Sequence, residues 1–274
     1  MEKIILFLCS TLVLNTMCGC KKNDDGIVSV APSDSIPQLS GWKLVWNDEF
    51  NGTKVDTGKW EFEVTGNGGG NNELQYYTDN SSNSYIENGA LIIRAIKEDY
   101  QGMQYTSARM RTKYKGDWKY GRFEIRAKLP FGKGLWPAIW MLPTDYVYGG
   151  WPKSGEIDIM ECLGDNTWKV YGTVHCADAN GSHIQFGGNY SLPKDSASFV
   201  GNFHVFAIEW DSTSIQWFVD DMKYYSKNIS APFDQRFHLL LNVAVGGDWP
   251  GNPNEFTTFP QLMTVDYVRV YQRP

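Results

Sequence analysis

The chain has 274 residues, of which 42% are apolar, and a formal net charge of −6 at neutral pH. This length suffices for one large domain or two small ones, and mild acidity lacks the basic footprint of a nucleic-acid-binding protein. We therefore expect no nucleic-acid partner. The aromatic content is high, at 15% of the residues, with 11 Trp, 15 Tyr and 14 Phe.

The N-terminal segment has one lysine and then an apolar run over residues 4–14. This run is too short to span a bilayer stably and is typical of a signal peptide. Gly19 before Cys20 resembles a bacterial lipoprotein cleavage site. We therefore predict a signal peptide over residues 1–19, lipidation of Cys20 and an outer-membrane lipoprotein, whose membrane contact is this lipid anchor alone. An ordinary secretory signal, giving a periplasmic or secreted protein, is the alternative.

Residues 20–40 read as the lipidated cysteine and a flexible tether, because they are polar and contain Pro and Ser. The lysines and aspartates after Cys20 resemble the tether of lipoproteins exposed at the cell surface, so surface exposure is a further hypothesis. From Gly41 onward there is no second linker and no repeat. We predict one domain over residues 41–274, and a monomer.

Short runs that alternate apolar and polar residues dominate this domain. In residues 122–129, RFEIRAKL, alternation places Phe123 and Ile125 on one face and charged residues on the other. Period two indicates a half-buried strand. The stretch IQWFVDDMKYY indicates a hairpin with Asp220 and Asp221 at its turn. Similar runs occur at residues 90–96, 204–210, 237–245 and 264–272.

Helical patterns are scarce in the domain, and glycines are frequent. Many strands in one long domain predict an all-β fold, a sandwich of two packed antiparallel sheets. The mature domain keeps two cysteines, Cys162 and Cys176. A hairpin of residues 156–162 and 170–176 holds them too far apart for a disulfide, so we predict two free thiols. Without paired CxxC motifs, a structural zinc site is disfavoured.

The stretch GEIDIMEC, residues 155–162, carries three carboxylates at an uneven spacing. In a regular strand Glu156 and Asp158 share one face and Glu161 points away. A β-bulge near Ile159 or Met160 adds one residue and returns Glu161 to the shared face. We predict that bulge.

Bulged in this way, the two glutamates stand four strand steps apart, roughly 13 Å between Cα atoms at ~3.3 Å per step. Leaning together, their carboxyl groups could reach the ~5–5.5 Å of a retaining glycosidase, and the ~6.5–9.5 Å of an inverting enzyme stays open. Asp158 between them would raise a neighbour's proton affinity, which a general acid needs. The alternative is an acidic sheet face without chemistry.

The preceding segment, LWPAIWMLP, places Trp136, Ala138 and Trp140 on one strand face. Indole faces stack on sugar rings, so tryptophans beside paired carboxylates favour a polysaccharide substrate, and core packing is the alternative. Trp151 and Trp249 lie in Gly-rich loops, which usually run over the surface.

Six motifs in order resemble one known family: NNELQYYTDN, WPAIWMLP, EIDIME, GTVH, VGGDWPG and VDYVRVYQ. From about Gly41 to the C-terminus, the chain resembles glycoside hydrolase family 16, specifically its laminarinase-type endo-β-1,3-glucanases. The resemblance implies a β-jelly roll of two curved antiparallel sheets with a concave substrate cleft. It also implies retaining cleavage of β-1,3 linkages in β-glucans such as laminarin, with no cofactor for catalysis.

The resemblance implies Glu156 as nucleophile, Glu161 as acid/base and Asp158 as the residue that holds the nucleophile and tunes its protonation. The bulged E-x-D-x-x-E form, as opposed to the compact form of the lichenases, favours β-1,3-glucans.

Substrate-binding residues are also implied, on both sides of these carboxylates. For His175, a structural role is as well supported as sugar contact. Arg109 shares its strand face with Arg111, so the sequence leaves open which of the two arginines reaches the sugar. Cys176 departs from the aromatic residue expected after the histidine, which leaves the aglycone side in doubt. The implied residues are Trp136, Trp140, Asn83, Arg109, His175 and Trp249.

A structural Ca²⁺ on the convex face is a further implication of the resemblance. The matching positions are Glu49 and Gly89 through their carbonyls and Asp266 through its side chain. Hard oxygen ligands suit Ca²⁺. The alternative is that Asp266 is an ordinary solvated strand residue.

Four other functions are weighed against this interpretation. Mixed-linkage β-1,3-1,4-glucan is hard to separate from β-1,3-glucan, whereas a sulfated algal galactan would require a basic cluster that the candidate loops lack. A surface lipoprotein that captures glycans without cutting them would not need three carboxylates together. A serine hydrolase is disfavoured because no G-x-S-x-G motif is present.

Overall fold

The fold is described for residues 36–193 and 198–274 of a computed structural model. The predicted signal peptide, the lipidation of Cys20 and most of the tether lie outside the described residues. Residues Gln38–Pro274 form one structural unit. Within the described part of the chain, no helix is long and apolar enough to cross a membrane.

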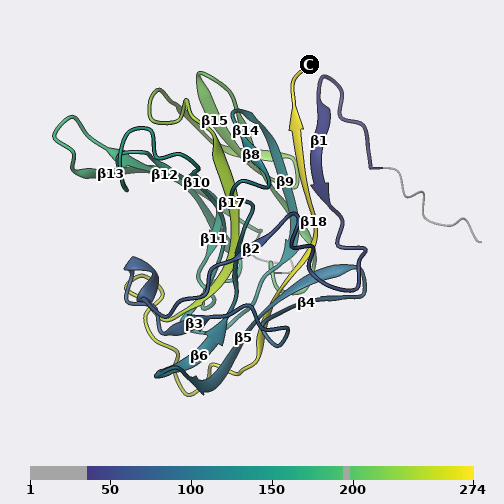
Figure 1. The fold of residues 1–274 in the computed structure, drawn as a ribbon, viewed down its shortest axis with the longest axis vertical. Coiled ribbons are helices and arrows are strands. Elements are labelled where there is room, and N and C mark those ends of the chain that lie inside the picture. The colour runs from purple at the N-terminus through teal and green to yellow at the C-terminus, as the bar shows by residue number, and fades with distance from the viewer. Residues whose placement is uncertain (1–35, 194–197) are drawn as a thin grey trace, which may run out of the picture. The chain divides into compact units, whose positions relative to one another are not determined.

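Two β-sheets face each other (Figure 1). The outer sheet has the strand order β16 (Met222–Asn228), β15 (Ser214–Val219), β14 (His204–Trp210), β9 (Gly121–Lys128), β18 (Gln261–Gln272), β5 (Ala90–Tyr100), β6 (Met103–Ser107) and β3 (Gln75–Tyr77), with β1 (Lys43–Asp48) beside β18 and β4 (Ser84–Glu87) beside β5.

The second sheet, called the cleft sheet below, has the order β13 (His183–Ser191), β12 (Lys169–Ala177), β11 (Glu156–Cys162), β10 (Leu135–Pro143), β17 (Phe237–Val245), β7 (Arg109–Arg111) and β2 (Glu61–Phe62), with β8 (Asp117–Trp118) beside β17. Pairing is antiparallel except between β3 and β6. A short 3-10 helix, Gly68–Gly70, precedes β3. The predicted all-β sandwich is confirmed.

Strand β9 confirms the alternation and adds one correction. Phe123 and Ile125 are fully buried against the core, as predicted. Arg122 and Glu124, on the face predicted to be solvated, are also buried. They can be buried because the Arg122 guanidinium donates a hydrogen bond to the Glu124 carboxylate at 2.7 Å, and a buried charge needs a partner.

The predicted hairpin between β15 and β16 is present, with a two-residue turn. Asp220 and Asp221 both have positive φ angles, of 48° and 64°. That is the requirement of a type I′ turn, whose twist matches the twist of the paired strands. Aspartate tolerates this backbone region better than most residues.

Much of the aromatic content fills the space between the sheets. Trp60, Trp210 and Trp217 are among the largest fully buried side chains. Each buried aromatic removes about 150–250 Å² from water, so these residues dominate the core. The indole of Trp217 also donates a hydrogen bond across the core, from Nε1 to the carbonyl oxygen of Asp158, at 2.8 Å.

The two cysteines are buried and free, as predicted. Cys162 pairs with Val170 beside the turn that joins β11 to β12. Cys176 lies near the far end of the same hairpin, opposite Ile184 of β13. Burial raises the pKa of the Cys162 thiol to about 12, so it stays protonated and inert.

Candidate active site

The predicted β-bulge in β11 is present. Asp158 pairs with Thr173 of β12 and Glu161 pairs with Tyr171, so three steps along β11 face two steps along β12. On the other side, the pairing of β11 with β10 passes over Ile159. The bulge therefore absorbs one residue and brings all three carboxylates to the same face of the cleft sheet.

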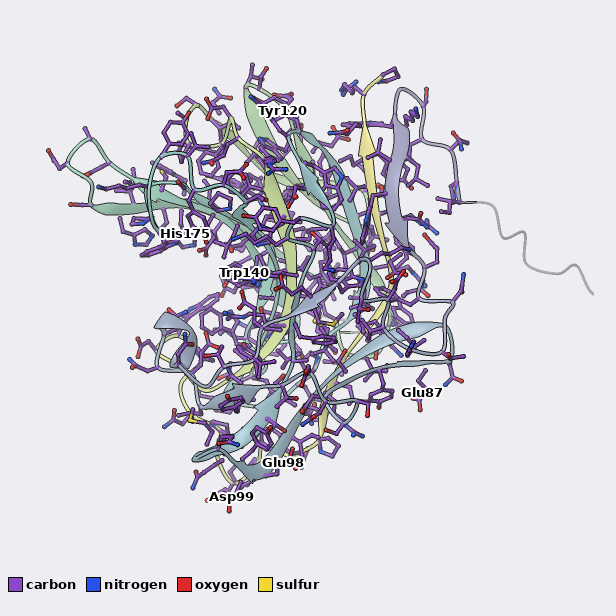
Figure 2. The ribbon with its side chains drawn as sticks, in the orientation of Figure 1. Glu87, Glu98, Asp99, Tyr120, Trp140 and His175 are labelled. Atoms are coloured by element: carbon purple, nitrogen blue, oxygen red, sulfur yellow. The ribbon has the colours of Figure 1, made fainter. Side chains whose placement is uncertain are left out.

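A cleft of about 840 Å³ crosses this face from β13 to β7. Trp140 and His175, from β10 and β12, both lie in it (Figure 2). The three carboxylates of β11 lie within it together with aromatic and polar side chains from five other strands and three connecting segments. Its lining includes Trp136, Trp140, Tyr171, Thr173, His175, His183, Gln185, Asn242, Trp249 and Arg109.

Each glutamate receives a hydrogen bond from one indole. The Nε1 of Trp151 donates to Oε2 of Glu156 at 2.8 Å, and the Nε1 of Trp136 donates to Oε1 of Glu161 at 3.0 Å. Hydrogen bonds to a carboxylate favour its charged form and fix its orientation. The sequence predicted these tryptophans as surfaces for sugar rings and did not predict this second role.

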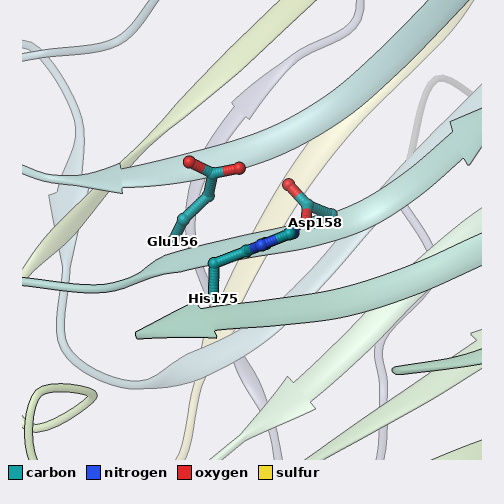
Figure 3. Close-up of side chains that lie close together, drawn as sticks. All are labelled: Glu156, Asp158 and His175. Atoms are coloured by element: carbon teal, nitrogen blue, oxygen red, sulfur yellow. Dashed lines mark ion pairs between the residues drawn. The ribbon is translucent and has the colours of Figure 1, made fainter. Parts of the chain in front are cut away.

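Asp158 lies beneath the glutamates and is only 2% exposed. Its Oδ2 lies 3.0 Å from Nε2 of His175, the residue opposite Glu156 on β12 (Figure 3). The other ring nitrogen of His175, Nδ1, lies 2.8 Å from Nε2 of His183. His175 thus contacts Asp158 and also lines the cleft, so its position is compatible with both the structural role and the sugar contact that the sequence left open.

The three carboxyl groups hold protons more tightly than ordinary carboxyl groups. Burial, and next the charge of Asp158, raise the pKa of Glu156 to about 8, and burial raises the pKa of Asp158 to about 8. Burial and the charges of both neighbours raise the pKa of Glu161 well above its usual value. His175 and the Trp151 indole act in the opposite direction and lower the pKa of Glu156. The group therefore holds shared protons at neutral pH, as acid catalysis requires.

The far wall of the cleft is anchored in the interior. Trp140 donates from Nε1 to Asn242 at 2.7 Å, Asn242 donates to the Tyr77 hydroxyl at 3.1 Å, and Tyr77 donates to Glu73 at 3.1 Å. The Arg109 guanidinium lies 4.6 Å from the Tyr77 ring centroid and 5.2 Å from that of Trp140. This hydrogen-bonded chain fixes the plane of the Trp140 indole.

The structure separates the two arginines that alternation leaves equivalent. Arg109 lines the cleft. Arg111 instead binds Glu61 at 2.9 Å and Glu63 at 2.5 Å, and is not among the lining residues. Of the two, Arg109 is therefore placed to reach a sugar.

Asn83 lies elsewhere than expected. It is fully buried, accepts a hydrogen bond from the Thr78 hydroxyl at 2.6 Å, and donates to Thr106 and to the Arg94 carbonyl. The cleft lining does not include it. Because its amide already has partners in the interior, its position does not support the expected sugar contact.

Trp249 forms part of the cleft rim beside Trp136, the indole that is bonded to Glu161. Its ring meets Trp136 edge to face at 5.5 Å between centroids and Tyr171 at 5.1 Å. It remains 41% exposed, which leaves a large apolar surface for a ligand. The expected position of Trp249 in the cleft lining is thus where the structure places it.

Several cleft residues were missed by the sequence analysis, although signals for some existed. Tyr171 and Thr173 share the face of His175 by period two, and Asn242 is a lone amide in an apolar strand. His183 follows the turn signal Asn180-Gly181, which predicts that β12 folds back onto β13. In the observed register His183 pairs with Ala177, diagonal to His175.

The residues expected to hold Ca²⁺ engage arginines on the outer sheet. The Glu49 carboxylate binds Arg269 through both oxygens, at 3.0 and 2.7 Å, which leaves its carbonyl as the candidate ligand. Asp266 is the extra residue at a bulge of β18 and contacts Arg126 at 2.5 Å through Oδ2. The other oxygen of Asp266 and the two carbonyls are all oxygen atoms, the kind of ligand that a hard cation prefers.

Glu156, Asp158 and His175 also lie close together, with one ligand atom of each within 4.8 Å of the others. The contact between the Asp158 carboxylate and the His175 imidazole accounts for this proximity. We therefore interpret the group as acid–base machinery and not as a metal centre.

Comparisons of the sequence and of the structure with known proteins agree on one family. Residues 70–269 match the family Glycosyl hydrolases family 16. A beta-glucanase from Rhodothermus marinus is 45% identical over 282 residues, which cover 96% of this chain and 94% of that protein. Glucan endo-1,3-beta-glucosidase A1 from Niallia circulans is 41% identical over 88% of this chain and 39% of that protein. The X-ray structure of the laminarinase from Rhodothermus marinus superposes with a TM-score of 0.78, at 47% identity, over 84% of this chain and 97% of that chain.

Proposed function

The chain belongs to glycosyl hydrolases family 16, and we propose that Glu156 is its nucleophile and Glu161 its general acid and base. It is an endo-β-1,3-glucanase of the laminarinase type, which cleaves β-glucans with retention. The observation that supports the residue roles is the bulge in β11, because it brings Glu156, Asp158 and Glu161 to one face of the cleft. The β-jelly roll expected from the resemblance agrees with the fold of the laminarinase structures.

In this mechanism Glu156 attacks the anomeric carbon and forms a glycosyl–enzyme intermediate, while Glu161 protonates the leaving oxygen. Glu161 then removes a proton from the water that hydrolyses the intermediate. The raised pKa of Glu161 keeps it protonated for the first step. The Trp151 hydrogen bond and the nearby His175 favour the ionised form of Glu156, which the attack needs.

Asp158 acts on both glutamates, of which Glu161 must be protonated and Glu156 ionised. It is buried beside both glutamates, and its charge contributes to the raised pKa of each. When Asp158 carries the proton that the pair shares, Glu156 is free to ionise. Asp158 is therefore proposed to hold the nucleophile and to tune its protonation, without contacting the substrate.

Trp136, Trp140 and Trp249 are proposed as surfaces for sugar rings, with Arg109 as a polar contact. All four line the cleft. Trp140 and Arg109 lie toward β17 and β7, on one side of the carboxylates, whereas His183 and Gln185 lie on the other side. A polysaccharide that crosses the strands can thus contact the enzyme on both sides of the scissile bond.

The first test is the release of reducing ends from laminarin and, in parallel, from barley mixed-linkage glucan. The wild type is expected to cleave laminarin, and Glu156→Gln to lose about 10⁴-fold or more of that activity. Cleavage of the mixed-linkage glucan alone would contradict the β-1,3 preference. NMR of the first-formed product is expected to show the β-anomer, as retention requires.

We further propose that Cys20 is lipidated and that the protein is an outer-membrane lipoprotein, supported by the sequence Gly19-Cys20 after an apolar run. Replacing Cys20 by Ser should move the protein from the membrane fraction to the soluble fraction. Treating intact cells with protease tests surface exposure. Unchanged membrane association of the Cys20→Ser variant would refute the anchor.

A structural Ca²⁺ bound by the carbonyls of Glu49 and Gly89 and the carboxylate of Asp266 is also proposed. The support is the oxygen-only donor set and the bulge that presents Asp266. An ion bound to the folded state alone stabilises it by mass action. A chelator should therefore lower the melting temperature, and Asp266→Asn should abolish that response. A melting temperature that is the same with and without chelator would contradict the site.

A further inference from the structure

His183 begins strand β13 and contacts both side chains that flank the Glu156–Asp158 pair. Its Nε2 lies 2.8 Å from Nδ1 of His175, whose other nitrogen lies 3.0 Å from Asp158. Its ring centroid lies 4.8 Å from the Trp151 ring, whose N–H is bonded to Glu156. A single side chain thus closes a ring of contacts around the nucleophile.

The contact between the two imidazoles is a hydrogen bond in the plane of the rings. Their planes differ by only 15°, and their centroids are 5.1 Å apart, which is the separation of two rings that meet edge to edge through the 2.8 Å N···N contact. One nitrogen must donate and the other accept. The hydrogen-bond network decides which, since neither proton is observed directly.

His183 is the acceptor in this bond. Burial and the charge of His175 lower the pKa of His183, so its ring is neutral near neutral pH and its Nε2 can accept. His175 then donates from Nδ1. This bond holds the His175 ring with its Nε2 facing the Asp158 carboxylate, 3.0 Å from Oδ2.

Other charged groups near His183 are part of the same hairpin or of the Trp151 loop. The Asp178 carboxylate accepts the backbone N–H groups of Asn180 and Ser182 in the turn, and Lys153 lies beside Gly181. Neither contributes to the lowered pKa of His183. His175 is therefore the charged group to which His183 responds.

We propose that His183 is a positioning residue for the hydrolysis, which holds the His175 ring against Asp158 on one side and orients the Trp151 indole on the other. This inference rests on the proposed role of Glu156 as nucleophile. His183 does not touch the reacting atoms in this scheme. It acts through two neighbours that both favour an ionised Glu156.

The position of the His175 ring is what His183 controls. His175 lowers the pKa of both glutamates, and such an effect depends on the distance between the groups. If His183 no longer accepts a hydrogen bond from Nδ1, the His175 ring can turn away from the carboxyl groups. The pKa of Glu156 then rises, and the nucleophile ionises only at higher pH.

Two substitutions separate the two contacts of His183. His183→Phe keeps an aromatic ring against Trp151 and removes the acceptor, whereas His183→Gln keeps a carbonyl acceptor and removes the ring. For His183→Phe, the acid limb of the kcat/KM profile on laminarin should move up by about 0.5–1 pH unit, with KM little changed. For His183→Gln, the acid limb should move less than in His183→Phe, because the carbonyl still accepts from His175 and only the ring contact with Trp151 is lost. KM should rise about threefold, since Trp151 lines the cleft and is held less firmly.

The matched control is Asn189→Ala, an exposed position of β13 outside the cleft lining, which should behave as the wild type. Nitrogen-15 NMR of the His175 ring gives a second readout, since the Nδ1 signal of a hydrogen-bonded N–H should change in His183→Phe and persist in His183→Gln. A His183→Phe profile that superposes on an active wild type overturns the inference. Failure of the proposed role of Glu156 as nucleophile would be seen in a different experiment, in which the Glu156→Gln variant still cleaves laminarin.

Discussion

Two groups of three carboxylates lie on opposite sheets of this sandwich, and they differ in their partners. On the outer sheet Glu124, Glu209 and Asp221 surround Arg122 at 2.7, 2.9 and 2.9 Å. On the cleft sheet the carboxylates of β11 have no arginine or lysine ion pair among the described residues. Their partners are instead the indole N–H groups of Trp136 and Trp151 and the imidazole of His175.

The difference shows how a fold assigns a structural or a chemical role to the same side chain. A guanidinium neutralises its acids permanently, because it does not lose its proton in proteins. An indole orients a carboxylate without neutralising it, and burial then raises the pKa of the acid. Carboxylates around an arginine are thus fixed in charge, and those on β11 can exchange protons.

The largest effect expected from this contrast is on activity. Glu161→Gln should lower kcat on laminarin by about 10²–10⁴-fold, because the leaving oxygen loses its proton donor. The loss should be smaller on an aryl laminaribioside, whose leaving group needs little protonation. Glu209→Gln on the outer sheet is the matched control and should retain wild-type kcat. A comparable loss in Glu209→Gln would remove the distinction between the two groups.

The second effect is on stability. Arg122→Met leaves the buried Glu124 without its partner and should lower the free energy of unfolding by about 3 kcal/mol. For a domain of this size that is a decrease in melting temperature of about 6–12 °C by calorimetry. Asp221 adds little, since it is 85% exposed in its side chain. At 25 °C the folded variant should keep its activity, and a selective loss of kcat would contradict a structural role.

The smallest effect distinguishes the two indoles. The Trp151 hydrogen bond lowers the pKa of Glu156, so Trp151→Phe should raise it and move the acid limb of the kcat/KM profile to higher pH. The Trp136 hydrogen bond lowers the pKa of Glu161, so Trp136→Phe should keep the general acid protonated longer and move the alkaline limb to higher pH. Each shift should be about 0.5 unit or more.

Trp168→Phe is the control for both indole variants, because Trp168 is exposed and does not line the cleft. Its pH profile should match that of the wild type. If both cleft variants shift the same limb, the assignment of one indole to each glutamate is wrong.

Periodicity predicted much of the fold and the centre of the site. Alternation predicted β9, β14 and β17, and the uneven spacing of Glu156, Asp158 and Glu161 required a bulge that the register confirms. These features follow from local rules, since successive side chains of a strand point to opposite faces.

Contacts between distant segments could not be predicted in this way. Alternation places Arg109 and Arg111 on one face. Both lie near Glu63, about fifty positions away in the sequence, and only Arg109 also lies near Glu73 and lines the cleft. Asn83 turns inward because Thr78 and Thr106 offer it partners. The contact of His183 with Trp151 depends on how a loop and an edge strand meet, which no spacing encodes.

The hydrogen bond from Trp217 to the backbone of Asp158 has a consequence for enzyme engineering. The bulge interrupts the regular pairing of β11 with β12 after Asp158. The indole of Trp217, which belongs to the opposite sheet, donates its hydrogen bond to this carbonyl from the core side. Grafting the segment EIDIMEC onto another sandwich would transfer the acids without this support. A transplant should therefore include the strand that carries Trp217, so that the portable unit of this catalyst is a pair of strands from two layers and not a linear peptide.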